Sequence, residues 1–482
     1  MKVSFISLGC AKNLVNTEQM MALCAEAGYS IQAQPEGCDV VVVNTCGFLA
    51  SACEEAIENI LEMAELKKAG QVKKILVTGC MTQRYKEDIF HELPEVDGLL
   101  GTGSYGDIAT AIAEVMEKGE KPCHLGNIHT ANQSGERILS TPPWYAYLRI
   151  AEGCDNHCAY CVIPSLRGKY RSRPMNELLD EAAELASAGV KELIVIAQDI
   201  TRYGVDLYHE KKLPELLREL CKLDFHWIRL HYLYPEIIDD ELIDLIANED
   251  KIVKYLDIPI QHINNDILRR MNRHCTGDEI RALLQKLRAR IPGLVLRTSL
   301  ITGLPGEGEA EFEELCAWLR ENKLERVGAF VFSPEDGTPA AKMEHADEEV
   351  AQRRAEIIAE LQSRIMDEYD FVKMISQEET QVTDEVFLAD YNVYLERIFI
   401  CDPERTLFTC IMRDVTKARQ RRNKIQKTKI HAADLADDII ANQLRIVHEI
   451  ASLLGETAAE TKVAVHDLKE AIMLDEDGDD DA

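Results

Sequence analysis

The first part of the chain alternates short apolar runs with longer segments of helical spacing. The runs that predict strands are residues 2–8, 39–44 and 74–78, and the segments that predict helices between them are residues 16–27 and 53–68. Four consecutive valines, Val40 to Val43, are typical of a strand buried on both faces. The alternation predicts a parallel sheet covered by helices on both sides, a domain that we assign to residues 1–125.

A second alternating region follows a segment rich in Gly, Asn, Ser and Pro, residues 126–143, which we interpret as a linker. Within residues 144–342 the predicted strands are 147–151, 192–197, 227–232, 255–260, 295–301 and 326–332. Six such β/α units favour a partial barrel over a closed eightfold one.

The pattern changes again towards the carboxyl terminus. We predict a connecting helix over residues 343–374 and a strand-rich fragment with a basic segment over residues 375–430. Residues 431–474 have helical spacing, and the acidic residues 475–482 are predicted to be disordered. The last part is therefore expected to be a small α+β tail.

Charge and composition narrow the possible partners. The chain has 482 residues, 46% of them hydrophobic, and a net charge of −30. Such a field repels nucleic acid phosphates and attracts basic proteins, so nucleic acid is the less favoured partner. The first residues do not resemble a signal peptide, and no apolar run approaches the roughly 18 residues of a membrane helix. We expect a cytoplasmic protein without a membrane partner.

Cysteine is the residue type that points to chemistry. Fifteen cysteines in a cytoplasmic chain are expected to be metal ligands or core residues rather than disulfides. Cys154, Cys158 and Cys161 have the spacing C-x3-C-x2-C directly after a predicted strand, and Tyr160 stands beside the last of them. Three thiolates can hold three irons of a four-iron cluster and leave the fourth open to a small molecule. A zinc knuckle that includes His157 and a redox dithiol are the alternatives.

A second set of three cysteines is scattered in sequence. Cys10, Cys46 and Cys80 each follow a predicted strand of the first domain. The carboxyl ends of parallel strands meet at one edge of the sheet, where loops converge on ligands. We therefore predict a second cluster with three cysteine ligands and one open iron. The alternative is that each is a small buried residue.

These motifs resemble a known family. Residues 154–161 resemble the signature loop of radical S-adenosylmethionine (SAM) enzymes, and residues 7–13 and 44–48 resemble the amino-terminal domain of methylthiotransferases. The match extends through residues 163–173, 197–199, 257–262 and 332–338, and covers the chain to about residue 372. The resemblance implies a flavodoxin-like first domain, a partial (β/α)6 radical SAM barrel, two 4Fe-4S clusters held by the two cysteine sets, and SAM.

Further residues take their expected roles from the resemblance. Tyr160, Gln198, Asp199, Arg297, Gly303 and Glu307 are the expected SAM contacts. Gln198 and Asp199 end a predicted strand, so a helix cap is the alternative for them. Arg297, Gly303 and Glu307 lie in a strand and glycine turn that is also compatible with an ordinary turn.

Within the family, the chain is more similar to the members that modify a small-subunit ribosomal protein than to those that modify tRNA. Lys12 and Glu335 stand where the tRNA-modifying members tend to have Met and Arg. The implied reaction inserts a methylthio group at the β carbon of an aspartate of a basic ribosomal protein, with an electron donor such as flavodoxin or ferredoxin. A tRNA adenosine methylthiotransferase and a non-catalytic iron–sulfur redox sensor remain as alternatives. The tail faintly resembles strands of a PAS domain in place of the TRAM domain that usually closes the family, and the sequence leaves the oligomeric state open.

Overall fold

The computed structural model describes residues 1–130, 134–362, 381–388, 393–401 and 408–416. The chain divides into two compact units, Met1–Ser363 and Arg364–Ala482, and each is described by itself. The first unit contains both predicted α/β domains, and the division lies within the predicted connecting helix.

The amino-terminal domain is a doubly wound parallel sheet. Its strands are β1 (Lys2–Ser7), β2 (Ser30–Gln32), β3 (Cys38–Thr45), β4 (Val72–Gly79), β5 (Gly98–Gly103) and β6 (Cys123–Gly126). They lie in the order β2-β1-β3-β4-β5-β6, and every neighbouring pair is parallel. The sheet confirms the predicted flavodoxin-like fold, in which the strand order reverses between β1 and β3. Strands β2, β5 and β6 were not identified from the sequence.

The helices of this domain are α1 (Ala11–Glu26), α2 (Ala50–Lys68), α3 (Cys80–Tyr85), α4 (Asp88–Glu92) and α5 (Ile108–Ala113), with the short turns η1 (Tyr105–Asp107) and η2 (Glu114–Lys118). Helix α1 begins at Ala11, five residues before the predicted start at residue 16, so that start was wrong. Asn13 and Asn16 interrupt the apolar pattern there, yet both are buried. The Asn13 amide donates to the carbonyl oxygens of Leu8 and Thr45, each at 3.0 Å, which satisfies a polar group inside the fold.

The second domain is a six-stranded partial barrel. Its strands are β7 (Tyr145–Arg149), β10 (Glu192–Ile196), β11 (Trp227–Leu230), β12 (Ile252–Asp257), β13 (Val295–Thr302) and β14 (Arg326–Val331), and a separate antiparallel pair is formed by β8 (Ala151–Glu152) and β9 (Arg171–Ser172). The order β14-β13-β12-β11-β10-β7 is parallel throughout, with β7 and β14 at the two edges. All six predicted barrel strands are present, which confirms the predicted fold class.

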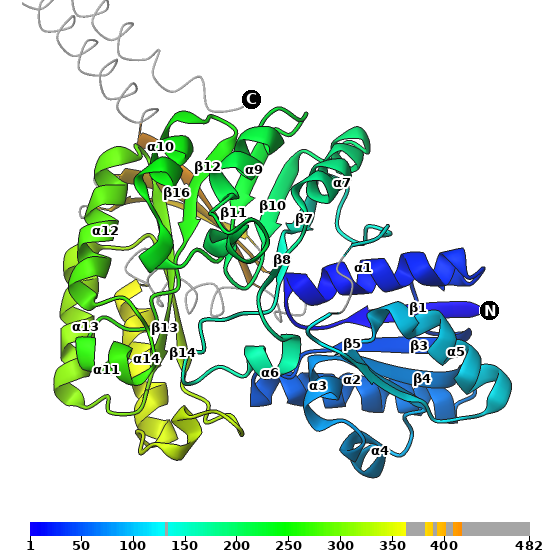
Figure 1. The fold of residues 1–482 in the computed structure, drawn as a ribbon. Coiled ribbons are helices and arrows are strands. Elements are labelled where there is room, and N and C mark those ends of the chain that lie inside the picture. Colours follow the sequence, from blue (N-terminus) through cyan, green and yellow to red (C-terminus); the bar gives the residue numbers. More distant parts are fainter. Residues whose placement is uncertain (131–133, 363–380, 389–392, 402–407, 417–482) are drawn as a thin grey trace, which may run out of the picture. The chain divides into compact units, whose positions relative to one another are not determined.

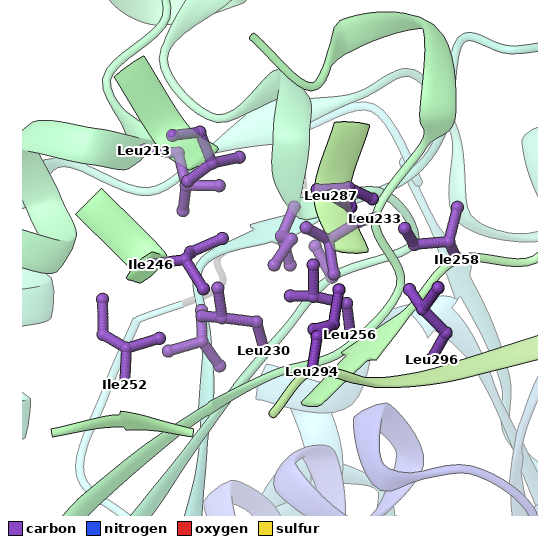
Figure 2. Packing of buried hydrophobic residues seen from close by; sticks show 14 of the residues in the cluster. Leu213, Leu230, Leu233, Ile246, Ile252, Leu256, Ile258, Leu287, Leu294 and Leu296 are labelled. Carbon is purple, nitrogen blue, oxygen red and sulfur yellow. The ribbon is translucent and has the colours of Figure 1, made fainter. Parts of the chain in front are cut away.

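The helices of this domain surround the strands, and most of them lie on the outside of the barrel (Figure 1). They are α6 (Ile163–Arg167), α7 (Met175–Ser187), α8 (Val205–Tyr208), α9 (Leu213–Leu220), α10 (Asp240–Asn248), α11 (Asn265–Arg270), α12 (Gly277–Arg290), α13 (Glu309–Asn322) and α14 (Glu348–Gln362), with the turns η3 (Ile200–Arg202), η4 (Pro235–Ile237) and η5 (Ala340–Lys342). Leucine and isoleucine side chains of helices and strands pack together, as Figure 2 shows for Leu287 of α12 with Leu230 of β11 and Leu256 of β12. Removing these apolar side chains from water is the main term that holds the barrel together.

The two domains of the first unit share an interface. Helix α6 of the barrel packs against α3 and β5 of the amino-terminal domain, and α1 packs against β7. The carboxyl edges of both sheets therefore meet in one place.

The second unit contains three antiparallel strands, β15 (Gln381–Leu388), β16 (Val393–Cys401) and β17 (Phe408–Asp414). They agree with the strand-like alternation predicted within residues 375–430. Helix α14 begins at Glu348, so the predicted start of the connecting helix at residue 343 was wrong. Residues 363–374 of that predicted helix lie outside the described residues. The predicted helical segment 431–474 and the acidic tail 475–482 also lie outside them. None of the described helices has the length and apolar character needed to cross a membrane.

Candidate active site

The first set of cysteines gathers where the strand order of the amino-terminal sheet reverses. Cys10 follows β1 and is the residue before α1, and Cys46 follows β3. The two loops approach so closely that a Cβ on Gly9 would lie 2.7 Å from Cβ of Cys46. Cys80 opens α3 directly after β4. All three therefore stand at the carboxyl edge of the sheet, as the topology predicted.

The second set lies in the loop after β8. Gly153 turns the chain there with a φ of +77°, a conformation that favours glycine. The N–H group of Cys161 donates to the carbonyl oxygen of Cys158 at 3.0 Å, and Sγ of Cys158 lies 2.8 Å from the hydroxyl oxygen of Tyr234. The first contact closes a turn between Cys158 and Cys161, and the second ties the loop to Tyr234 of the barrel domain.

Both cysteine sets face the same cavity. It has a volume of about 450 Å³, and its lining includes Cys10, Cys46, Cys80, Cys154, Cys158 and Cys161. Each set offers three sulfur donors to that space, which is the donor chemistry of an iron–sulfur cluster with one open iron. Across the described residues, no group of three or more His, Cys, Asp or Glu side chains is placed to hold a single metal ion.

The thiols differ in acidity. Burial alone would raise the pKa of Cys10, but the charges of Lys12 and Arg167 and the N–H groups of Asn13 and Lys12 hold it below the ordinary value. Burial raises the pKa of Cys46 and of Cys154 to about 11 each. Cys10 is therefore the thiol that the protein itself favours as a thiolate.

A network of buried charged and polar side chains lies next to the cavity. The Arg167 guanidinium donates to Glu152 at 3.0 Å and to the side-chain oxygens of Asn16, at 3.2 Å, and Asn13. Arg149 donates to the same oxygen of Glu152 at 3.1 Å. Burial would raise the pKa of Glu152, but the two guanidinium groups lower it to about 2. Because Asn13 and Asn16 belong to α1 and Glu152 to the barrel, Arg167 joins the two domains.

The expected SAM contacts have different positions in the structure. Tyr160 and Gln198 line the cavity, and Gln198 also donates to Glu152 at 3.1 Å. Asp199 is fully buried and accepts from the N–H group of Thr201 at 3.0 Å, so its side chain caps η3. This is the cap that the sequence left open as the alternative for Asp199.

The other three expected contacts lie outside the cavity lining of the described residues. Arg297 pairs at 2.7 Å with Asp257, which does line the cavity. Gly303 has a φ of +76°, and its N–H group donates to Glu307 at 3.0 Å. Arg354 of α14 holds the same carboxylate oxygen at 2.8 Å. Glu307 thus connects the turn at Gly303 with helix α14, outside the described cavity lining.

Sequence reasoning did not assign several of the polar residues of the cavity to the site. Lys12, Tyr234 and Arg273 line it and come from three distant parts of the chain. Arg273 lies over the Tyr234 ring, 4.1 Å from its centroid, and one of its terminal nitrogens is 3.9 Å from Sγ of Cys158. Nothing in local spacing signals such a contact, since it depends on how the barrel brings its loops together. Lys12 carried one signal, its position two residues after Cys10.

Two protein-family models match this chain, one in each domain of the first unit. The model described as "Radical SAM superfamily" matches residues 148–319, and the one described as "Uncharacterized protein family UPF0004" matches residues 2–101. The fold is similar to that of the radical SAM methyltransferase TsrM from Kitasatospora setae, with a TM-score of 0.54 and 16% identity over 70% of this chain and 74% of that one. At this identity the likeness concerns the fold alone.

Closer relatives are found among curated proteins. A protein from Lachnoclostridium phytofermentans named ribosomal protein uS12 methylthiotransferase RimO is 47% identical over 406 residues, which are 84% of this chain and 92% of the relative. Proteins of the same name from Syntrophomonas wolfei and Clostridioides difficile are 44% and 45% identical, over 94% and 89% of their lengths. The chain therefore belongs to the RimO family of ribosomal protein uS12 methylthiotransferases.

Proposed function

We propose that this chain is a radical SAM methylthiotransferase that replaces a hydrogen on the β carbon of an aspartate in ribosomal protein uS12 with a methylthio group. Family membership supports the enzyme class and the uS12 substrate. The observation that carries the proposal is that both cysteine sets line one cavity of about 450 Å³. A reaction that brings together a SAM molecule, a sulfur source and a substrate carbon requires this arrangement.

Six cysteines are proposed as cluster ligands, with Cys10, Cys46 and Cys80 on one side and Cys154, Cys158 and Cys161 on the other. When bound, the barrel cluster would supply an open iron for SAM and the electron for its cleavage, and the second cluster would supply an open iron that carries sulfur. The resident cofactors are thus two 4Fe-4S clusters and SAM.

The chain's own residues orient and enclose the reactants. Tyr160 and Gln198 are proposed to contact SAM, because they line the cavity beside the barrel cysteines. The other expected contacts are proposed to hold the residues that line the cavity and not to touch SAM themselves. They are Asp199, Arg297, Gly303 and Glu307. Arg297 holds Asp257 at the cavity wall, and Glu307 fixes the turn at Gly303. Supporting contacts of this kind fix the groups in front of them.

In this proposal residues 1–125 form the domain that carries the sulfur-delivering site, and residues 144–342 form the domain that carries the SAM site. We also propose a cytoplasmic setting with a reducing donor such as flavodoxin or ferredoxin, because free thiols persist in reducing compartments.

The test uses full-length protein reconstituted with iron and sulfide. About eight irons per chain are expected, along with 5′-deoxyadenosine on addition of SAM and reductant. Purified uS12 should then gain the mass of one methylthio group less the hydrogen that it replaces, on an aspartate located by peptide mass spectrometry. A methylthio group in tRNA with none in uS12 would refute the substrate, and about four irons without SAM cleavage would favour a sensor.

Single-cysteine variants separate the two sites. Cys158→Ala is expected to abolish both SAM cleavage and methylthio transfer. Cys10→Ala is expected to abolish methylthio transfer and to lower the iron content by about half. Full methylthio transfer by Cys10→Ala would exclude its cluster from the reaction.

A further inference from the structure

Lys12 crosses from the amino-terminal domain into the mouth of the barrel. It lies in the first turn of α1, and its ammonium nitrogen is 3.4 Å from the carbonyl oxygen of Ala197 and 4.2 Å from the centroid of the Tyr232 ring. Both partners belong to the barrel. The residue lines the cavity and is 7% exposed.

This ammonium has no carboxylate ion-pair partner among the described residues, whereas three arginines near the cavity have one. Arg149 and Arg167 share Glu152, and Arg297 pairs with Asp257. A carbonyl and an aromatic ring offset only part of the cost of burying an ammonium ion. Lys12 also lowers the pKa of Cys10, but it shares this effect with Arg167 and with the backbone N–H groups of Asn13 and Lys12. The thiolate of Cys10 is therefore stabilised by several groups and does not depend on the Lys12 ammonium alone. The Lys12 ammonium is therefore available to form an ion pair with an anion that enters the cavity.

Two carboxylates must enter this cavity during the proposed reaction, that of SAM and that of the substrate aspartate. Arg273 contacts the barrel set of cysteines through Cys158, so it is placed to meet a ligand bound there. Lys12 belongs to the domain that holds the other set. Each set of cysteines therefore has one cation nearby, Lys12 or Arg273, that forms no ion pair with a carboxylate among the described residues.

We propose that Lys12 forms a subsite for the side-chain carboxylate of the substrate aspartate, an inference that rests on the proposed function. The β carbon of aspartate is bonded directly to the carboxylate carbon. An ion pair at Lys12 would therefore hold the reacting carbon one bond from its anchor, on the side from which sulfur arrives. The same pair would select aspartate over asparagine, since a neutral amide gains less from a buried ammonium.

A double-mutant cycle tests the pairing. Binding of fluorescently labelled uS12 to the reconstituted holoprotein is measured with SAM but without reductant, so that no turnover occurs. Wild-type protein should bind uS12 about tenfold or more tightly than uS12 whose modified aspartate is changed to asparagine. In Lys12→Met this preference should fall below about twofold, because the two changes remove the same interaction.

Lys121→Met is the matched control. Its ammonium also contacts a carbonyl oxygen, that of Pro94 at 2.9 Å, and lies over an aromatic ring, Phe90, 5.4 Å from the centroid. It belongs to the amino-terminal domain but lies outside the cavity lining of the described residues. The aspartate preference should therefore persist in this variant.

The outcomes are distinguishable. If Lys12→Met keeps the preference for aspartate, the subsite is refuted although the proposed function stands. A loss of SAM affinity or of iron in Lys12→Met, with that preference intact at matched iron content, would assign Lys12 to SAM or to the thiolates and also refute it. If wild-type protein modifies no aspartate of uS12, the proposed function fails first and the subsite with it.

Discussion

At the scale of single residues, the site is governed by buried charge. Arg167 is 2% exposed and connects Glu152 of the barrel with the α1 side chains Asn13 and Asn16. Arg167→Met would leave Glu152 with Arg149 as its one remaining cation among the described ion pairs. Breaking such a buried pair is expected to lower the free energy of unfolding by about 3 kcal/mol.

Urea denaturation of the metal-free protein measures this loss. Adding Glu152→Gln should recover part of it, because the carboxylate left without its partner is then gone. Arg218→Met, which removes an exposed pair with Glu241, is the control and should cost at most about 1 kcal/mol. An equal cost for the two arginines would refute the proposed role of Arg167.

The pKa values of the cysteines predict an order of alkylation in metal-free protein. Cys10 has a lowered pKa, whereas burial raises that of Cys46 to about 11 and that of Cys161 to about 12. Because the thiolate is the nucleophile, iodoacetamide at neutral pH should label Cys10 first. Raising the pH towards 11 should then bring in Cys46. Peptide mass spectrometry gives the order, and equal labelling of Cys10 and Cys46 at neutral pH would contradict it.

At the scale of elements, the turn at Gly153 sets the position of the barrel cysteine loop. Gly153 has a φ of +77°, and a Cβ there would lie 2.1 Å from the carbonyl oxygen of Lys169. Gly189, in the turn after α7, has a φ of +94° and no atom within 4 Å of the Cβ position. Alanine costs about 1–2 kcal/mol of backbone strain at either site, but only Gly153→Ala must also displace the neighbouring chain. Gly153→Ala should therefore lose SAM cleavage and about half of its iron, whereas Gly189→Ala should keep both.

The comparison between sequence and structure also belongs to this scale. The strands with a continuous apolar run were predictable, whereas the short strands β2 and β6 and the glycine-rich β5 lack such a run and were not identified. The convergence of Cys10, Cys46 and Cys80 followed from their place after parallel strands. The start of α1 was not predictable, because Asn13 and Asn16 are polar residues buried by contacts that depend on the other domain. Lys12 and Arg273 were missed for the same reason: their partners lie far away in sequence.

At the scale of the whole molecule, the described cavity residues belong to one unit. Each described residue that lines the cavity precedes Ser363, where the first compact unit ends. The barrel strands and both cysteine sets therefore lie within the first unit. We expect a chain that ends at Ser363 to take up as much iron as the full chain and to cleave SAM at a similar rate.

This truncation also separates chemistry from substrate docking. The three described strands of the second unit form an antiparallel sheet of their own, so their removal leaves the parallel sheets of the first unit intact. Iron analysis and 5′-deoxyadenosine formation report on the core, while methylthio transfer to uS12 reports on docking. If iron and SAM cleavage persist but transfer to uS12 falls, the second unit helps to hold the ribosomal protein. Loss of iron or of SAM cleavage would instead show that the core depends on the second unit, contrary to this expectation.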